Sequence, residues 1–220
     1  MKKLNNNPWL HENKFYLTSD KSRILKLIDH YEVFKKIKKV KGDIFEFGVF
    51  KGVSLIRFLT FRDLIENSNK RKVVGFDAFG KFPKPKSNKI NKAQDVFFAK
   101  KHDKKIGLGI KEDLLRKVLL KKNFSNFELY KGNILDTLPN YLKKNSKFKI
   151  ALLHLDLDVY EPTEFVLNFL FKKISKNGII LLDDYKHIKG ATLAVNKFLK
   201  EKKLKINKVS KNGRPYYIKK

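Results

Sequence analysis

The segment that most restricts the fold is residues 42–54, Gly-Asp-Ile-Phe-Glu-Phe-Gly-Val-Phe-Lys-Gly-Val-Ser. Its apolar residues predict a short buried strand, Gly48 and Gly52 bracket a turn, and a helix is predicted over about residues 53–65. In an α/β sheet, this is where a nucleotide-like cofactor binds. Glycine lets the backbone approach a ligand, and the helix N-terminus offers free N–H groups. An ordinary connecting loop is an equally good interpretation of this segment alone.

The composition predicts one folded domain. The chain has 220 residues, of which 42% are hydrophobic, and this is enough for a sizeable core. Because cysteine is absent, disulfides and thiolate metal sites are excluded. The polar residues 1–7 predict no signal peptide, and no apolar run reaches the length of a membrane span. We therefore expect a cytoplasmic protein.

The formal net charge of +29 raises the question of nucleic-acid binding. The charge comes mostly from lysine and is spread along the chain, whereas arginine is the residue preferred for phosphate and base contacts. A generally basic surface is therefore the favoured interpretation, with nucleic acid an unlikely partner. A small-molecule or glycan acceptor and a homo-oligomeric assembly are both compatible with this composition.

Apolar runs alternate with helical patterns along the chain, which predicts an α/β fold with a mostly parallel sheet. A helix is expected from an N-cap at Ser19 to about Ile37, another with Pro162 in its first turn that runs to about Ile174, and a third over 191–200. Asn212-Gly213 predicts a C-terminal antiparallel hairpin. The further predicted strands lie at 72–77, 127–131, 149–156, 179–182, 205–209 and 215–218.

One domain, residues 1–220, is expected to carry two additions. Residues 1–37 are predicted to form an N-terminal arm and a helix. Residues 78–125 are too long for a simple connection and predict a lid-like insertion with helices near 93–101 and 112–121. The lysine-rich stretch 82–92 within it suits a mobile lid or a surface loop. His102 has no partner in the sequence pattern.

Acidic residues gather where the predicted strands end. The chain has only 22 acidic residues, so six at strand ends are more than a solvated surface would give. Asp77 comes 29 positions after Gly48, the place where an acid grips a ribose in dinucleotide-binding folds. The six are Glu46, Asp77, Asp156, Asp158, Asp183 and Asp184.

Three of these carboxylates predict a metal site. Asp156, Asp183 and Asp184 come together if the fourth and fifth strands are neighbours, and crowded carboxylates repel unless a cation lies between them. Mg²⁺ or Ca²⁺ is the natural occupant. In the alternative interpretation, the aspartates pair with Lys186 and Lys189.

An ion held there would lower the pKa of a substrate hydroxyl and orient its oxygen. Either Asp158 or His187 could then accept the hydroxyl proton, and the sequence leaves both open.

Five segments in register resemble class I S-adenosylmethionine-dependent methyltransferases and, more narrowly, the macrocin O-methyltransferase family. They extend over about residues 37–199. The segments are Phe45–Ser54, Gly75–Pro83, Tyr130–Asn133 with Asp136–Pro139, His154–Thr163, and Asn177–Tyr185.

The resemblance implies a Rossmann-like, seven-stranded sheet with helices on both faces and a reversed final hairpin. It also implies that the segment 78–125 is a lid. The reaction it implies is Mg²⁺-assisted O-methylation of a hydroxyl, most plausibly on a sugar, with S-adenosylmethionine as the donor.

The same resemblance implies the site residues. The turn around Gly48 would hold the methionine part of the cofactor, Asp77 the ribose, and the segment after the third strand would lie near the adenine. Asp156, Asp183 and Asp184 would hold Mg²⁺. The implied cofactor-binding residues are Glu46, Gly48, Gly52, Ser54, Asp77, Gly132, Asn133 and Asp156.

The family often has glycine where this chain has Leu157, and serine where it has Pro162.

A nucleic-acid methyltransferase is the alternative, because it would explain the charge. Enzymes that methylate base amino groups usually carry a proline pair after the fourth strand to hold a flipped base. This chain has Asp-Leu-Asp-Val at 156–159 instead, which favours the O-methyltransferase.

Overall fold

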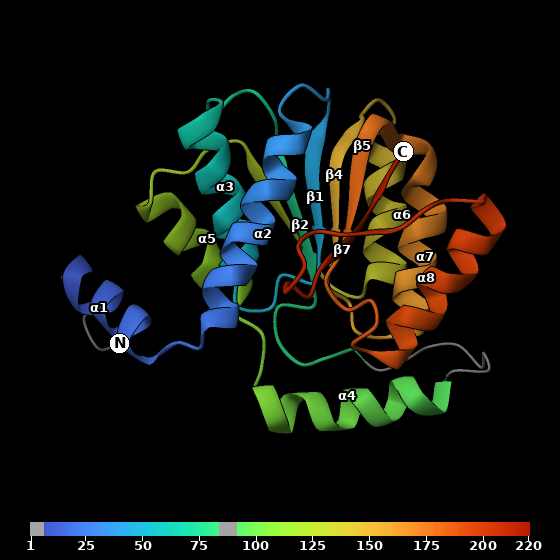
Figure 1. The fold of residues 1–220 in the computed structure, drawn as a ribbon, viewed down its shortest axis with the longest axis horizontal. Helices are drawn as coiled ribbons and strands as arrows, with labels where there is room; N and C mark the ends of the chain where they lie inside the picture. Colours follow the sequence, from blue (N-terminus) through green and yellow to red (C-terminus); the bar gives the residue numbers. More distant parts are fainter. Residues whose placement is uncertain (1–6, 84–91) are drawn as a thin grey trace.

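The computed structural model describes residues 7–83 and 92–220. In these residues a seven-stranded sheet has the order β3-β2-β1-β4-β5-β7-β6 (Figure 1). The first five strands pair in parallel, and β7 runs antiparallel to both β5 and β6. The strands are β1 (Asp43–Phe47), β2 (Val73–Asp77), β3 (Phe127–Lys131), β4 (Ile150–Leu155), β5 (Ile174–Leu182), β6 (Asn207–Lys208) and β7 (Tyr216–Lys219).

Helices cover both faces of the sheet (Figure 1). They are α1 (Pro8–Thr18), α2 (Lys21–Ile37), α3 (Val53–Ile65), α4 (Lys92–Ile106), α5 (Glu112–Lys121), α6 (Ile134–Lys144), α7 (Tyr160–Leu170) and α8 (Lys189–Lys202), with a short 3₁₀ turn at Phe171–Lys173. The predicted α/β fold, parallel sheet and reversed C-terminal strands are confirmed.

The core consists of two layers, one on each side of the sheet. Phe45 and Leu153 face the layer formed with α6, α7 and α8, whereas Ile44 and Leu152 face the layer formed with α2, α3 and α5. This division follows from the strand period of two, which sends neighbouring side chains to opposite faces. The same alternation decides where the polar residues at the strand ends point.

Several helix and strand boundaries in the structure differ from the predicted ones. The helix predicted from Ser19 begins at Lys21 and is capped by Asp20, whose side chain accepts a hydrogen bond from Ser22 N at 2.8 Å. Strand β5 begins at Ile174, five residues earlier than predicted, because residues 174–178 extend the strand instead of ending a helix. The arm before α2 contains the helix α1, which has no buried residue.

The insertion after β2 places α4 across the edge where the parallel strands end (Figure 1). Asp95 fastens α4 there, because its buried carboxylate accepts hydrogen bonds from Tyr160 N at 3.0 Å and Glu161 N at 3.2 Å, at the start of α7. The lid expected for 78–125 stays a prediction, and residues 84–91 of the lysine-rich stretch lie outside the described residues. Within the described residues, no helix is both long and apolar enough to cross a bilayer.

Candidate active site

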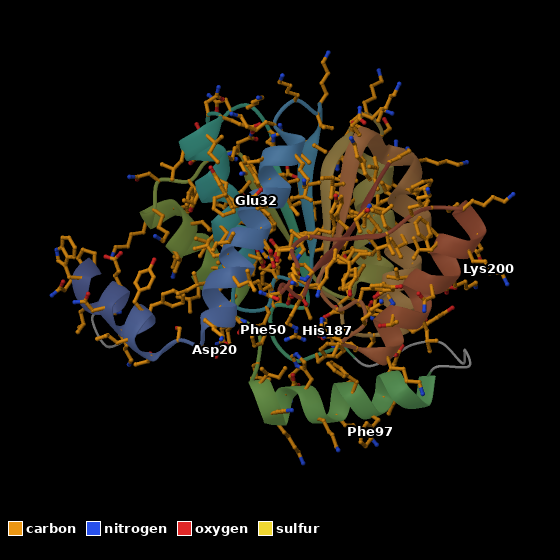
Figure 2. The ribbon with its side chains drawn as sticks, viewed as in Figure 1. Asp20, Glu32, Phe50, Phe97, His187 and Lys200 are labelled. Carbon is orange, nitrogen blue, oxygen red and sulfur yellow. The ribbon has the colours of Figure 1, made fainter. Side chains whose placement is uncertain are left out.

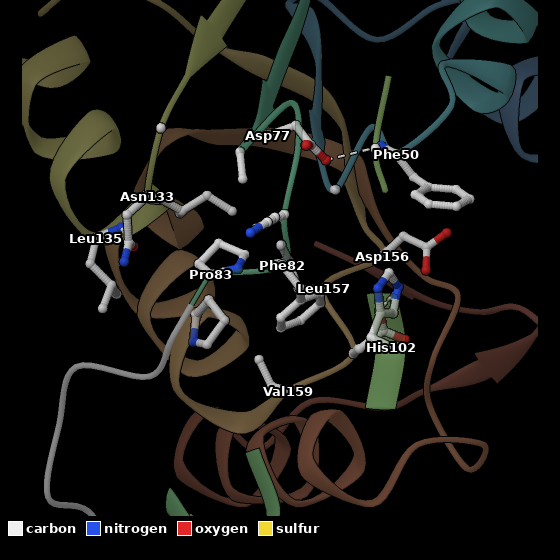
Figure 3. Close-up of a pocket in the computed structure, with 18 of the residues that line it drawn as sticks. Phe50, Asp77, Phe82, Pro83, His102, Asn133, Leu135, Asp156, Leu157 and Val159 are labelled. Atoms are coloured by element: carbon white, nitrogen blue, oxygen red, sulfur yellow. Dashed lines mark hydrogen bonds and ion pairs between the residues drawn. The ribbon is translucent and has the colours of Figure 1, made fainter. Parts of the chain in front are cut away.

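A cavity lies at the carboxyl ends of β1, β2, β3 and β4, and residues 80–83 after β2 also line it (Figure 3). Five residues predicted to bind the cofactor line it: Gly48, Asp77, Gly132, Asn133 and Asp156. Phe82, Pro83 and Leu157 supply apolar surface (Figure 3). An apolar cavity with a few polar groups at the strand ends is the usual form of a cofactor site in an α/β sheet.

Gly48 is required by the packing of the protein itself. Its backbone has φ +90°, and a Cβ at this position would lie 1.9 Å from the carbonyl oxygen of Asp156. The ends of β1 and β4 therefore approach more closely than any side chain would allow. The expected reason for glycine was the approach of a ligand, and the structure adds this contact between the two strands.

The carboxylate of Asp77 organises the turn after β1. Oδ2 accepts hydrogen bonds from Phe50 N at 2.9 Å (Figure 3) and from Val49 N at 2.8 Å. Oδ1 accepts one from Phe79 N at 2.6 Å. A carboxylate has about four acceptor positions, so one remains for a ligand hydroxyl. The structure is compatible with the ribose role and shows a second role that the sequence did not indicate.

Three predicted cofactor residues do not line this cavity. Glu46 is fully buried and accepts a hydrogen bond from Ser54 Oγ. Gly52 has φ +81° at the N-cap of α3, where a Cβ would lie 2.6 Å from a methyl group of Leu115. These residues hold β1, α3 and α5 together.

The carboxylates at the ends of β4 and β5 divide into two groups. Asp156, Asp158 and Asp184 each offer an oxygen within 4.8 Å of the others. Asp184 Oδ2 also accepts a hydrogen bond from Asp158 N at 2.8 Å, which holds Asp158 in a left-handed conformation with φ +63°. Asp156 and Asp158 line both the cofactor cavity and a second cavity beside it.

Asp183, which was predicted to hold the metal together with Asp156 and Asp184, lies in the other group of side chains. Its carboxylate contacts the ammonium of Lys26, lies 3.4 Å from His154 Nε2 and 3.6 Å from His30 Nε2. His154 Nδ1 lies 3.6 Å from Glu46 Oε1 on its other side. The structure thus places a buried imidazole between two buried carboxylates.

The pKa directions follow from this arrangement. Burial opposes charge on His154, but Asp183 and Glu46 more than offset it and raise its pKa to about 10. Burial lowers the pKa of His30 to about 4. Although burial also opposes the charge of Asp183, His154 and Lys26 hold its pKa well below the ordinary value. An imidazolium and an ammonium therefore neutralise Asp183, whereas burial raises the pKa of Glu46 although His154 partly counters this.

The charges of the other group are only partly compensated. Burial and the neighbouring Asp156 raise the pKa of Asp158 to about 7. Burial, Asp156 and Asp158 raise the pKa of Asp184 well above its ordinary value, and burial raises that of Asp156, which the ammonium of Lys26 partly counters at 3.4 Å. Three carboxylates that resist ionisation together form an oxygen donor set that fits Mg²⁺ or Ca²⁺.

The second candidate proton acceptor, His187, is exposed and lines neither cavity (Figure 2). Burial lowers its pKa, and the nearby Arg214 adds to the effect. Asp158 instead lines both cavities. Of the two predicted proton acceptors, the structure brings only Asp158 to the site.

His102 and Lys26 are site residues that sequence reasoning missed. His102 lines both cavities, with Nε2 4.0 Å from Asp158 Oδ2 and its ring against Phe50, Phe82 and Phe98. No local pattern indicates such a residue, because α4 reaches the sheet edge only through the tertiary fold. A lysine near the N-terminal end of α2 gives no signal either in a chain with so many lysines.

Comparison with protein families decides the type of site. A family model described as "Macrocin-O-methyltransferase (TylF)" matches residues 19–217. The chain belongs to the macrocin O-methyltransferase (TylF) family. Membership makes it an O-methyltransferase that uses S-adenosylmethionine, as the resemblance implied. A search among curated proteins returned no match.

Solved structures agree on the fold. CalS11, described as a calicheamicin methyltransferase, is 24% identical and has a TM-score of 0.71, with 97% of this chain and 87% of CalS11 covered. Its apo form, described as a TDP-rhamnose 3'-O-methyltransferase, is 23% identical with a TM-score of 0.69, covering 99% and 88%. The O-methyltransferase NovP is 22% identical, with a TM-score of 0.71 and coverage of 89% and 79%.

Proposed function

We propose that this TylF-family enzyme methylates a hydroxyl group of a sugar, with Mg²⁺ on Asp156 and Asp184 and with Asp158 as the proton acceptor. The observation that carries the proposal is the cluster of Asp156, Asp158 and Asp184, whose oxygens lie within 4.8 Å of one another where the two cavities meet. One cavity suits the donor, and the other suits the acceptor.

The residues around the first cavity fit S-adenosylmethionine. Asp77 keeps acceptor capacity for a ribose hydroxyl, and Asn133 lies opposite it in the cavity (Figure 3). When bound, the donor supplies an electrophilic methyl group on a sulfonium. The acceptor oxygen gains the methyl, the carbon–sulfur bond breaks, and the hydroxyl proton must leave. The chain's own task is to orient the hydroxyl and to take this proton.

Asp158 suits this task by position and by charge. It borders both cavities, and in the metal-free site burial and the neighbouring Asp156 raise its pKa, which favours proton uptake by this carboxylate. Mg²⁺ is commonly held by one or two carboxylates and keeps exchangeable water ligands, so Asp156 and Asp184 suffice. The ion would lower the pKa of a hydroxyl that displaced such a water.

A sugar acceptor is supported by one structural neighbour, whose description names TDP-rhamnose, and by the acidic cluster, which suits a pair of neighbouring hydroxyls. The test is to incubate the enzyme, Mg²⁺ and methyl-labelled S-adenosylmethionine with a cell extract and to identify the labelled product. We expect a methylated sugar. Label in nucleic acid would overturn the assignment of the acceptor.

Asp158→Asn tests the mechanism separately. We expect kcat to fall about 100-fold or more, with unchanged affinity for S-adenosylmethionine in calorimetry. Asp113→Asn, a change of the same kind at an exposed position on α5, is the matched control and should keep full activity. Equal activity of the two variants would remove Asp158 from the mechanism.

A further inference from the structure

The second cavity has a volume of about 620 Å³, a size typical of metabolite sites. Its lining comes from three segments far apart in the sequence: α2, α4, and the turn at 212–214 before β7. The buried carboxylates Asp183 and Asp184 lie in its lining, and His102, Asp156 and Asp158 join it to the cofactor cavity. An acceptor that reaches these acids must therefore pass or touch the residues of all three segments.

Each of the three segments adds exposed cationic side chains to this cavity. Arg23 comes from α2, Lys101 and Lys105 from α4, and Arg214 from the turn. Lys26 also lines the cavity, but its ammonium is engaged by Asp156 and Asp183. The lining therefore combines buried acidic side chains with four exposed cationic side chains.

Arg23 and Arg214 differ from three of the four other arginines, which have carboxylate partners. Arg62 and Arg71 are buried and bound to backbone carbonyls and carboxylates, and Arg116 pairs with Glu112 at 2.8 Å. Among the residues that the structure describes, neither Arg23 nor Arg214 forms an ion pair.

Other positive groups lie near these two arginines. Burial lowers the pKa of Arg57, and the neighbouring Arg23 lowers it further, while Arg214 acts in the same direction on His187. The carboxylates of the same lining, Asp29 among them, are mostly buried. Exposed cations from separate segments that form no ion pair are suited to bind an anion.

We infer that the acceptor is a phosphorylated sugar, whose phosphate lies between Arg23 and Arg214 while a sugar hydroxyl reaches Asp158. The inference rests on the proposed sugar O-methyltransferase function. Guanidinium groups bind phosphate oxygens in pairs of parallel hydrogen bonds, and Lys101 and Lys105 add charge that suits more than one phosphate. The phosphate can belong to a sugar phosphate or to a nucleoside-diphosphate sugar.

The site is tested by calorimetry on the full chain with S-adenosylmethionine and Mg²⁺ present, at near-physiological salt. The probes are pyrophosphate, a nucleoside diphosphate and an uncharged hexose. We expect the first two to bind the wild type, and the double variant Arg23→Gln/Arg214→Gln to bind them about tenfold more weakly or worse. Arg116→Gln, which removes the same charge from α5 outside the cavity, is the matched control and should bind like the wild type.

The probes also separate the two sources of phosphate. A nucleoside diphosphate that binds much more tightly than pyrophosphate identifies a nucleotide-linked sugar, and equal affinities identify a sugar phosphate. Both positions are exposed, so circular dichroism should show a folded double variant, and affinity that falls with added salt gives an independent check on the wild type.

Two results would overturn the inference: phosphate probes that do not bind the wild type, or a double variant that binds them as tightly as Arg116→Gln. If S-adenosylmethionine still binds in either case, the proposed methyltransfer to an uncharged sugar survives. If S-adenosylmethionine itself does not bind, the proposed function fails instead.

Discussion

Replacing His154 by glutamine tests the buried charge network at the base of the site. The imidazolium lies between Asp183 and Glu46, and the three side chains are almost fully excluded from solvent. Without the imidazolium, the buried carboxyl groups of Asp183 and Glu46 lose the positive charge that lies between them. The cost of leaving a buried charge unpaired is about 3–5 kcal/mol.

The pKa gives a similar magnitude. The pKa of His154 rises from 6.5 to about 10 on folding, and linkage converts this shift into about 4 kcal/mol at pH 7, shared with its partners. Because the folded pKa is the higher one, this stability is fully present below pH 6.5 and is lost as the pH rises through 10. The gap between the wild type and His154→Gln should therefore narrow between pH 7 and pH 10.

The assay is urea unfolding followed by circular dichroism at both ends of that range. His187→Gln is the matched control, since it makes the same change at an exposed site, and it should alter the free energy of unfolding by no more than about 0.5 kcal/mol. Adding Asp183→Asn to His154→Gln should cost less than the sum of the single changes, because both charges leave together. The reasoning is refuted if His154→Gln is as stable as His187→Gln, or if the gap does not depend on pH.

Four other outcomes can be measured. Gly48→Ala should lower the free energy of unfolding by about 2–4 kcal/mol in urea, because its Cβ would meet the Asp156 carbonyl at a positive φ; a change near zero would contradict this close approach. Asp77→Asn should weaken S-adenosylmethionine binding about tenfold in calorimetry, and unchanged affinity would remove Asp77 from the site. Since burial and Asp156 raise the pKa of Asp158 to about 7, NMR titration of the metal-free enzyme should show this carboxyl group ionising near pH 7, and ionisation near pH 4 would contradict the raised pKa. Chelation of divalent metal should abolish turnover and Mg²⁺ should restore it, whereas full activity in the chelator would exclude a metal role.

Local sequence patterns were enough to predict much of the fold. The apolar runs predict β3 and the helices α3 and α5 with the bounds that the structure has, because strand and helix periodicities are local properties of the chain. The Asn-Gly pair similarly predicts the reversed C-terminal strands. Boundaries moved where a neighbouring strand offered hydrogen bonds, as at Ile174, which pairs with Ile150 of β4.

The sequence also indicated the edge of the sheet where the chemistry lies, since the strand-end acids and the glycine turn meet there. It did not separate Asp183 from Asp184. Asp183 lies two positions after Leu181, whose side chain faces α2, and its carboxylate contacts Lys26 on that helix, whereas Asp184 accepts a hydrogen bond from Asp158 N. The strand alternation that predicts the core thus also divides the two acids.

By itself, then, the sequence determined the α/β sheet, the cofactor edge and the family, because each depends on short segments with their own pattern. The tertiary structure alone decided which carboxylates share a site, that Lys26 and His154 neutralise Asp183, and that α4 brings His102 to Asp158. Those contacts join side chains that are distant along the chain, and their energies depend on burial and on charges supplied by other elements. No local sequence pattern indicates the degree of burial or the charges that other elements supply.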